Sequence, residues 1–361
     1  MSVQERDVLA AMSTVMDPDL NMDVVKAGMV KDLKIDGGNV QLRIELTTPA
    51  CPMKEKIKGD AEAAVKKVSG VEKVVIEMTA RVRAQPKGPS KDQLLPLVKN
   101  VLLVGAGKGG VGKSTVALNL ACALARHGAT VGLLDADFYG PSVPVMTGIN
   151  KKPVSRDGKL LEPLEAHGIK VMSIGFLIEA DQALIWRGPM LQGALMQLVR
   201  DVNWGELDYL VVDLPPGTGD IPLTVAQQLK SAGAVLVTTP QDVALADVIR
   251  AKQMFDKLNI PILGIVENMS QFLCPHCGKG THIFDTGGGK KASDMMEISF
   301  LGEVPLELSI RQGGDRGLPV VVGKPDGAEG KSFMELAQKV AQRVSVENAT
   351  RTAPSVTIQT A

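Results

Sequence analysis

The stretch VLLVGAGKGGVGKSTVALNLA, from Val101 to Ala121, decides the fold of this 361-residue chain. Within it, Gly107 to Ser114 fits the pattern G-x-x-x-x-G-K-[ST], placed between an apolar strand-like run and a helix-like run. Backbone N–H groups of such a glycine-rich turn surround phosphates, and the following helix presents its positive end to them. The sequence therefore predicts a P-loop that binds ATP together with Mg²⁺.

Different side chains of this loop are expected to bind the phosphates and Mg²⁺. Lys113 is expected to reach the β- and γ-phosphates, and the hydroxyl of Ser114 is expected to bind Mg²⁺. The glycines let the backbone approach the phosphates without a Cβ in the way. The candidate nucleotide-binding residues of the loop are Gly107, Lys108, Gly109, Gly110, Val111, Gly112, Lys113, Ser114 and Thr115.

Lys108 is a second lysine in a loop that ordinarily needs one. KGGVGKST resembles the deviant Walker A motif of the MinD, ParA and nitrogenase-iron-protein group. The resemblance implies a homodimer in which Lys108 reaches the nucleotide of the other subunit. A cation delivered in this way can stabilise charge on the transferred phosphoryl group, as an arginine finger does. Lys108 and Lys113 are therefore both catalytic candidates.

Apolar runs alternate with helical patterns through the larger part of the chain: VLLVGAG, ATVGLLDAD, IKVMSIGF, DYLVVDLPP, GAVLVTTPQ and PILGIVENMS. Continuous Val, Leu and Ile runs suit strands that are buried on both faces. We predict an α/β fold with a doubly wound, mostly parallel P-loop NTPase sheet and helices on both faces, preceded by a small α+β domain. In such sheets, ligands bind at the carboxyl ends of the strands.

Polar residues follow several of these runs. In DYLVVDLPPGTGD, Asp213 ends an apolar strand, which is the Walker B arrangement that holds Mg²⁺ directly or through water. In GLLDADFYGPS, Asp135 and Asp137 lie at another strand end. Resemblance to the deviant Walker group implies that Asp137 aligns the attacking water and that Asp135 lies near the Mg²⁺ shell. The resemblance also places Asn268 on the adenine base.

Cys274 and Cys277 form a C-P-x-C turn in NMSQFLCPHCGKGTHIF, and two thiolates at this spacing can converge on one metal. A structural zinc site needs four ligands, and the chain has no second CxxC. His276 and His282 could complete a zinc site, or the pair could be a redox dithiol. A two-fold axis could instead bring two copies together, and their four thiolates could hold an iron–sulfur cubane.

The order of the motifs resembles that of the Mrp/ApbC family of iron–sulfur cluster carrier ATPases. The resemblance covers nearly the whole chain: DPDL and TTPACP in the small domain, then the deviant loop, WRGPM (Trp186 to Met190), DLPPGTGD, ENMS and CPxC. It implies that a labile [4Fe–4S] cluster bridges the homodimer through Cys274 and Cys277. It also implies that the cluster is passed to apo iron–sulfur proteins, with slow ATP hydrolysis, and that a cluster-assembly scaffold is a further partner.

We expect four segments: an iron–sulfur assembly-type domain at 1–84, a linker at 85–97, the ATPase domain at 98–345 and a disordered tail at 346–361. Cys51 follows a strand and precedes a helix, where the positive helix end favours the thiolate. A lone cysteine is more often an apolar filler, but the family resemblance leaves a functional role open.

The composition of the chain limits the classes of partner that it is expected to bind. Forty basic residues balance forty acidic ones, which indicates no large surface for nucleic acid or an anionic membrane. Charges near the N-terminus and the lack of a long apolar run favour a cytoplasmic protein. The alternative is a MinD- or ParA-like positioning ATPase whose CxxC binds structural zinc. A metal insertase is disfavoured because the chain has only four histidines.

Overall fold

The computed structural model describes residues 3–86, 94–156, 158–178, 188–274, 276–277 and 279–352. They form two compact units, one of residues 3–86 with 341–352 and one of residues 94–340. Part of the expected linker, Arg187 of the WRGPM motif, and the residues after 352 lie outside the described residues. The segment limits expected from the sequence stay a prediction.

The first unit is a three-stranded sheet with two helices. Its central strand pairs antiparallel with the preceding strand and parallel with the following one. The elements are α1 (Glu5–Met12), β1 (Met16–Asp17), β2 (Met22–Asp23), β3 (Val30–Asp36), β4 (Asn39–Leu46), α2 (Lys54–Lys66) and β5 (Lys73–Ala80). Together with the short β1–β2 pair, these elements form the small α+β domain that the sequence predicted.

Alternation along β4 explains how this unit holds together. Its even-numbered side chains are buried, and so are the residues of α2 that repeat at helical spacing: Val40, Leu42, Ile44, Leu46, Ile57, Ala61 and Val65. Period-two burial on a strand and four-residue spacing on a helix place one apolar face of each element against the other. These residues belong to one hydrophobic core with the buried side chains of α1.

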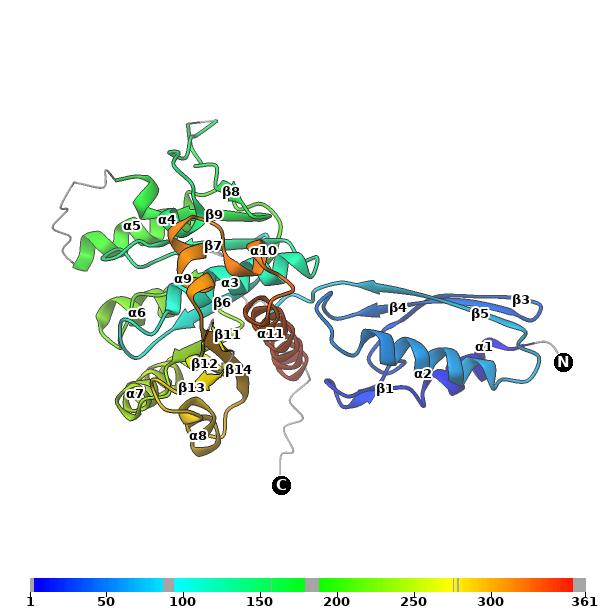
Figure 1. The fold of residues 1–361 in the computed structure, drawn as a ribbon. Helices are drawn as coiled ribbons and strands as arrows, with labels where there is room; N and C mark the ends of the chain where they lie inside the picture. The colour runs from blue at the N-terminus through cyan, green and yellow to red at the C-terminus, as the bar shows by residue number, and fades with distance from the viewer. Residues whose placement is uncertain are drawn as a thin grey trace, which may run out of the picture. The chain divides into compact units, whose positions relative to one another are not determined.

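The second unit is built on a sheet with the strand order β13-β12-β11-β6-β10-β7-β9-β8, and β14 pairs with β12 (Figure 1). Its strands are β6 (Val98–Gly105), β7 (Val131–Asp135), β8 (Leu164–Ala166), β9 (Ile169–Ser173), β10 (Leu207–Asp213), β11 (Gly233–Thr238), β12 (Ile262–Leu273), β13 (Gly280–Thr281) and β14 (Phe300–Leu306). Its helices are α3 (Lys113–Arg126), α4 (Val143–Thr147), η1 (Ile174–Phe176, a 3₁₀ turn), α5 (Gly188–Arg200), α6 (Asp220–Gln228), α7 (Asp242–Lys257), α8 (Gly288–Met295), α9 (Leu308–Asp315), α10 (Val320–Gly323) and the first part of α11 (Ala328–Thr352), whose residues from 341 onward belong to the first unit.

The central strands confirm the predicted fold class. Every residue of β7 and β11 is buried, and β6 and β10 are buried almost throughout. The pairs among β6, β7, β9, β10, β11, β12 and β14 are parallel, whereas β8 and β13 add antiparallel edges. Strands buried on both faces need helices over them, and this explains their continuous aliphatic runs.

The last helix is longer than the sequence indicated. It reaches Thr352, so the expected start of the tail at residue 346 falls inside α11. In the described part of the chain, no helix combines the length and apolarity that crossing a bilayer requires.

Candidate nucleotide and metal-binding sites

The phosphate-binding loop joins the end of β6 to the start of α3. Gly112 directly precedes the helix with a left-handed φ of 80°, a conformation that glycine adopts without strain. Gly107 is constrained differently, since a Cβ there would lie 2.2 Å from the backbone oxygen of Asp247. The backbone path therefore favours glycine at both positions, and the approach of phosphates to these glycines stays a prediction.

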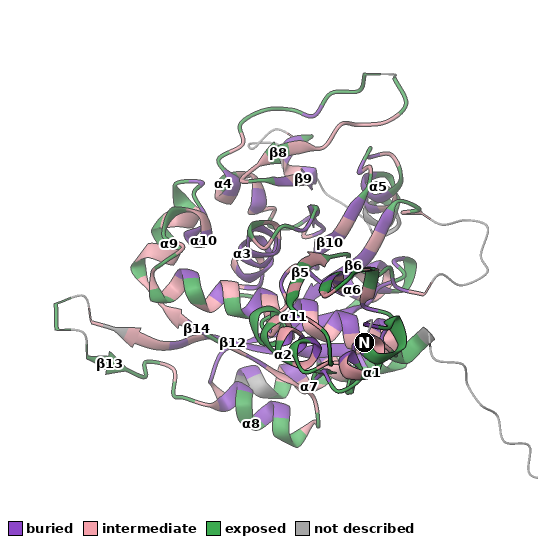
Figure 2. Ribbon diagram, turned by 90° about the vertical axis from the view of Figure 1, so that its right-hand side faces the viewer, coloured by how far each residue is buried: buried purple, intermediate pink, exposed green. Residues whose placement is uncertain are grey.

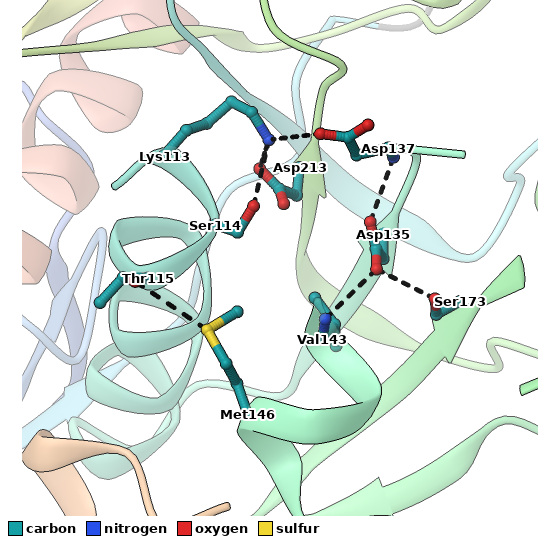
Figure 3. Close-up of polar contacts among 9 residues, drawn as sticks. All are labelled: Lys113, Ser114, Thr115, Asp135, Asp137, Val143, Met146, Ser173 and Asp213. Carbon is teal, nitrogen blue, oxygen red and sulfur yellow. Dashed lines mark hydrogen bonds and ion pairs between the residues drawn. The ribbon is translucent and has the colours of Figure 1, made fainter. Parts of the chain in front are cut away.

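The side chain of Lys113 is the centre of this site (Figure 3). Its Nζ lies 2.5 Å from Oδ1 of Asp213, 3.2 Å from Oγ of Ser114 and 3.7 Å from Oδ2 of Asp137. Lys113 is only 6% exposed and Asp213 is fully buried. The structure thus brings together four of the residues expected at the site. A phosphate oxygen would compete with these carboxylates for the same ammonium group.

Asp213 keeps one oxygen without a partner. Its Oδ2 is buried and accepts no hydrogen bond from the residues that the structure describes. Burial raises the pKa of the Asp213 carboxyl, and the charge of Lys113 opposes this rise. An unpartnered carboxylate oxygen beside a serine hydroxyl is a donor set that suits a hard cation such as Mg²⁺. Ser114 and Asp213 therefore fit the ion that the loop pattern implies.

Asp135 lies directly opposite Asp213 in the register of β7 and β10. Its Oδ1 accepts a hydrogen bond from the backbone N–H of Asp137 at 3.1 Å. Its Oδ2 accepts from the hydroxyl of Ser173 at 2.9 Å and from the N–H of Val143 at 3.4 Å. Burial, followed by the charge of Asp213, raises the pKa of Asp135 to about 7. Asp135 therefore fastens both ends of the loop from 137 to 143.

Ser173 was not found by sequence reasoning. Its hydroxyl donates to Asp135 and accepts from the N–H of Gly175 at 3.0 Å, and the residue is fully buried. The contact depends on the parallel register that places residue 173 opposite Asp135. A serine at the end of IKVMS, a run whose Ile169, Val171 and Met172 are apolar, is the signal that could have indicated it.

Asn268 lies beside the phosphate-binding loop. Its Nδ2 donates to the backbone oxygen of Val111 at 2.8 Å, and the residue is 5% exposed. A Cβ on Gly112 would lie 2.2 Å from that same nitrogen. Contact between Asn268 and an adenine base stays a prediction, as does the action of Lys108 across a dimer. Lys108 is half-buried in the loop.

The cysteine pair lies on an exposed hairpin that follows β12. β13 pairs antiparallel with the end of β12, and the N–H of Cys274 donates to the oxygen of Lys279 at 3.0 Å. Figure 2 shows β13 on an arm that extends from the sheet and is coloured as exposed. Cys274 is half-buried and Cys277 is exposed, while Pro275 and Gly278 lie outside the described residues.

The hairpin favours a thiolate at Cys274. Hydrogen bonds from the backbone N–H groups of His276 and Cys277, and then from the Cys277 side chain, lower the pKa of the Cys274 thiol. Nδ1 of His282 lies 3.4 Å from the oxygen of Ser270. The described residues contain no group of three or more His, Cys, Asp or Glu side chains placed to hold one metal. The proposed zinc site with both histidines therefore finds no support.

Cys51 corrects one expectation. The sequence predicted a thiolate near the start of α2, but burial raises the pKa of the Cys51 thiol to about 11. The charges of Asp19 and Asp17 add to this rise, and only a hydrogen bond from the N–H of Met53 lowers it. The cost of burying a charged sulfur therefore outweighs the stabilisation that the start of α2 was expected to give a thiolate. Cys122, the remaining cysteine, is fully buried in α3.

A glycine-rich loop between a buried strand and a helix, with lysine, serine and aspartate converging on one point, defines a P-loop NTPase. Solved structures share this architecture. A nucleotide-binding protein of Archaeoglobus fulgidus, solved with ADP, is 41% identical and superposes with a TM-score of 0.58 over 66% of this chain and 93% of its own. The cell division ATPase MinD of Pyrococcus furiosus has a similar fold at 22% identity, with a TM-score of 0.52 over 67% of this chain and 98% of its own.

Sequence comparison gives the family. Residues 97–341 match the family described as NUBPL iron-transfer P-loop NTPase, and residues 5–77 match the family described as iron-sulfur cluster assembly protein. The chain belongs to this iron-transfer P-loop NTPase family. It is 49% identical to an iron-sulfur cluster carrier protein of Synechocystis sp. over 94% of this chain and 97% of that protein. It is 48% identical to one of Deinococcus radiodurans over 94% of this chain and 95% of that protein.

Proposed function

We propose that the protein is a cytoplasmic homodimer that carries a labile [4Fe–4S] cluster and transfers it to apo iron–sulfur proteins. A cluster-assembly scaffold supplies the cluster, and neither nucleic acid nor a membrane is a partner. Cys274 and Cys277 of each copy provide the four thiolates that a cubane requires. The printed name of the Synechocystis relative, an iron-sulfur cluster carrier protein, supports this function.

One observation carries the proposal: each chain offers half of a cluster site. Cys274 is biased toward the thiolate, Cys277 is exposed, and no third ligand group lies beside them among the described residues. An isologous two-fold contact doubles any ligand set that lies on its axis. Two copies of this hairpin therefore complete a site that one copy cannot form, and the exposed sulfur leaves the cluster open to transfer.

The nucleotide site supplies binding and slow hydrolysis of ATP. Ser114 and Asp213 would hold Mg²⁺, which neutralises phosphate charge when bound. Lys113 binds the β- and γ-phosphates, and Lys108 of the other copy offsets charge at the transferred group. Asp137 orients a water molecule whose oxygen forms a bond to the γ-phosphorus. The bond to the bridging oxygen breaks, ADP leaves, and the water's proton passes to the phosphate or to solvent.

Anaerobic reconstitution with iron and sulfide tests this function. We expect visible colour, a dimer by mass and about four irons per dimer, as a Cys₄ cubane implies. The double variant Cys274→Ala, Cys277→Ala should lose colour and iron, whereas Cys51→Ala is the matched control and should keep both. Zinc at one per chain without colour would contradict the carrier function and favour the positioning ATPase with a structural zinc.

A further inference from the structure

Glu267 lies at the base of the segment that carries the cysteine pair. The segment from 268 to 287 leaves the sheet through the end of β12, passes both cysteines and returns at the start of α8. The carboxylate of Glu267 accepts hydrogen bonds from the N–H of Gly287, at 3.2 Å, and from the N–H of Gly289. The residue just before the segment thus accepts hydrogen bonds from the last residue of the segment and from the first turn of α8.

The start of α8 is shaped for this carboxylate. Glu267 is fully buried, so its charge is compensated by the N–H groups at the positive end of a helix. A Cβ on Gly288 would lie 2.2 Å from the oxygen of Pro240, and one on Gly289 would lie 2.9 Å from Cβ of Glu267. Only glycines allow this approach. Burial raises the pKa of Glu267, and the two N–H groups oppose the rise.

The neighbouring residue, Asn268, contacts the phosphate-binding loop. Its amide donates to the oxygen of Val111 at 2.8 Å, directly beside Gly112. Successive residues of a strand point to opposite faces of a sheet. Residues 267 and 268 of β12 therefore connect the cysteine-bearing segment on one side with the nucleotide loop on the other.

We propose that Glu267 is a positioning residue that couples the nucleotide loop to the Cys274–Cys277 pair by fixing both ends of their segment. A nucleotide that moves the Val111 carbonyl shifts Asn268 and its neighbour in β12. The clamp on α8 keeps the far end of the segment fixed, so the shift changes the hairpin between the two ends. This deepens the proposed function, because it names a route by which the nucleotide acts on the cluster ligands.

Thiol alkylation tests the coupling in the metal-free full chain. Rates of iodoacetamide reaction at Cys274 and Cys277 are followed by peptide mass spectrometry, with and without saturating Mg–ADP. We expect nucleotide to change these rates about fivefold, the lower range of measured coupling between sites. Cys51 is the internal reference and should not respond. Wild-type rates that nucleotide leaves unchanged would overturn the proposal.

Three variants test whether the coupling depends on Glu267. In Glu267→Gln the response of both cysteines should fall below about twofold while nucleotide still binds. Glu303→Gln removes the same charge at the exposed position opposite Glu267 in the β12–β14 register and should respond like the wild type. Gly289→Ala, whose Cβ displaces the carboxylate, should reproduce the loss if Glu267→Gln does not fold. A wild-type response in Glu267→Gln would exclude this role.

These outcomes are separate from those of the reconstitution. Alkylation needs no iron. A wild-type chain whose alkylation does not respond to nucleotide, but which assembles the cluster normally, therefore refutes only the coupling. A retained response with no cluster refutes only the carrier function. Loss of the response in Glu267→Gln but not in Glu303→Gln supports the positioning role, because a general loss of stability would not depend on nucleotide.

Discussion

The nucleotide site and the cysteine hairpin differ in how complete a single chain makes them. Lys113 and Asp213 lie 2.5 Å apart, 6% and 0% exposed, with Lys113 at the start of α3 and Asp213 at the end of β10. Cys277 is exposed at the tip of an arm with a two-residue strand. Burial makes the first site part of the fold, so damage to it should cost stability. Damage to the exposed hairpin should cost little stability, and a bound group can change its conformation.

Lys113→Ala should have the largest effect. It leaves the carboxylate of Asp213 buried without its cation, which costs about 3–5 kcal/mol of unfolding free energy. Loss of the phosphate-binding ammonium should also abolish ATP hydrolysis. Urea unfolding and an ATPase assay measure the two effects. Lys108→Ala is the matched control: the free energy of unfolding should change by no more than about 0.5 kcal/mol, while hydrolysis falls. Equal unfolding midpoints for both variants would contradict the buried ion pair.

Asp135 should make the free energy of unfolding depend on pH. Its pKa of about 7 in the folded state lies above the ordinary value of about 3.9, so between these values the folded protein binds more protons than the unfolded one. Stability from this group is therefore present at low pH and is lost as pH rises through 7, by about 3 kcal/mol between pH 5 and pH 8. Asp135→Asn should flatten that decline in urea unfolding. An unchanged decline would assign it to another group.

The convergence of side chains at the candidate nucleotide site was predictable because it follows from local rules. The loop pattern fixes Lys113 at a helix start, and neighbouring parallel strands bring Asp135 and Asp213 to one edge of the sheet. Ser173 and Glu267 were not predictable in this way. Each bonds a group far along the chain, and strand register and the position of α8 decide which group that is.

Cys51 shows where a local rule fails. The sequence correctly placed Cys51 just before a helix, since α2 begins at Lys54. The direction of the pKa was wrong because it depends on burial by the rest of the unit. Cys274 was predicted as a ligand from spacing and family resemblance, and this stays a prediction; its lowered pKa comes from N–H groups and a side chain within the same turn. Short-range features of a site follow from sequence; its desolvation does not.

Thiol chemistry sharpens the contrast between these cysteines. At pH 8, Cys274, with its lowered pKa, should react with iodoacetamide about tenfold faster than Cys51, whose pKa is about 11. The thiolate fraction of Cys274 is the larger of the two at this pH, and the greater nucleophilicity of the more basic thiolate offsets part of the difference. Peptide mass spectrometry measures both rates in one sample. In strong urea the two rates should converge, and a difference that persists there would trace to neighbouring sequence instead of the fold.

Cys277→Ala should have the smallest effect on stability, within about 0.5 kcal/mol, because an exposed thiol at a hairpin tip supports no core. Cys122→Ser is its matched control. It places a hydroxyl in the fully buried centre of α3, which costs about 1–3 kcal/mol unless a partner is found. Urea unfolding of both variants compares the free energy of unfolding after loss of the exposed Cys277 thiol with that after replacement of the buried Cys122 thiol. A large loss in Cys277→Ala would mean that the hairpin is part of the folded core, and the contrast between a buried nucleotide site and an adaptable metal site would fail.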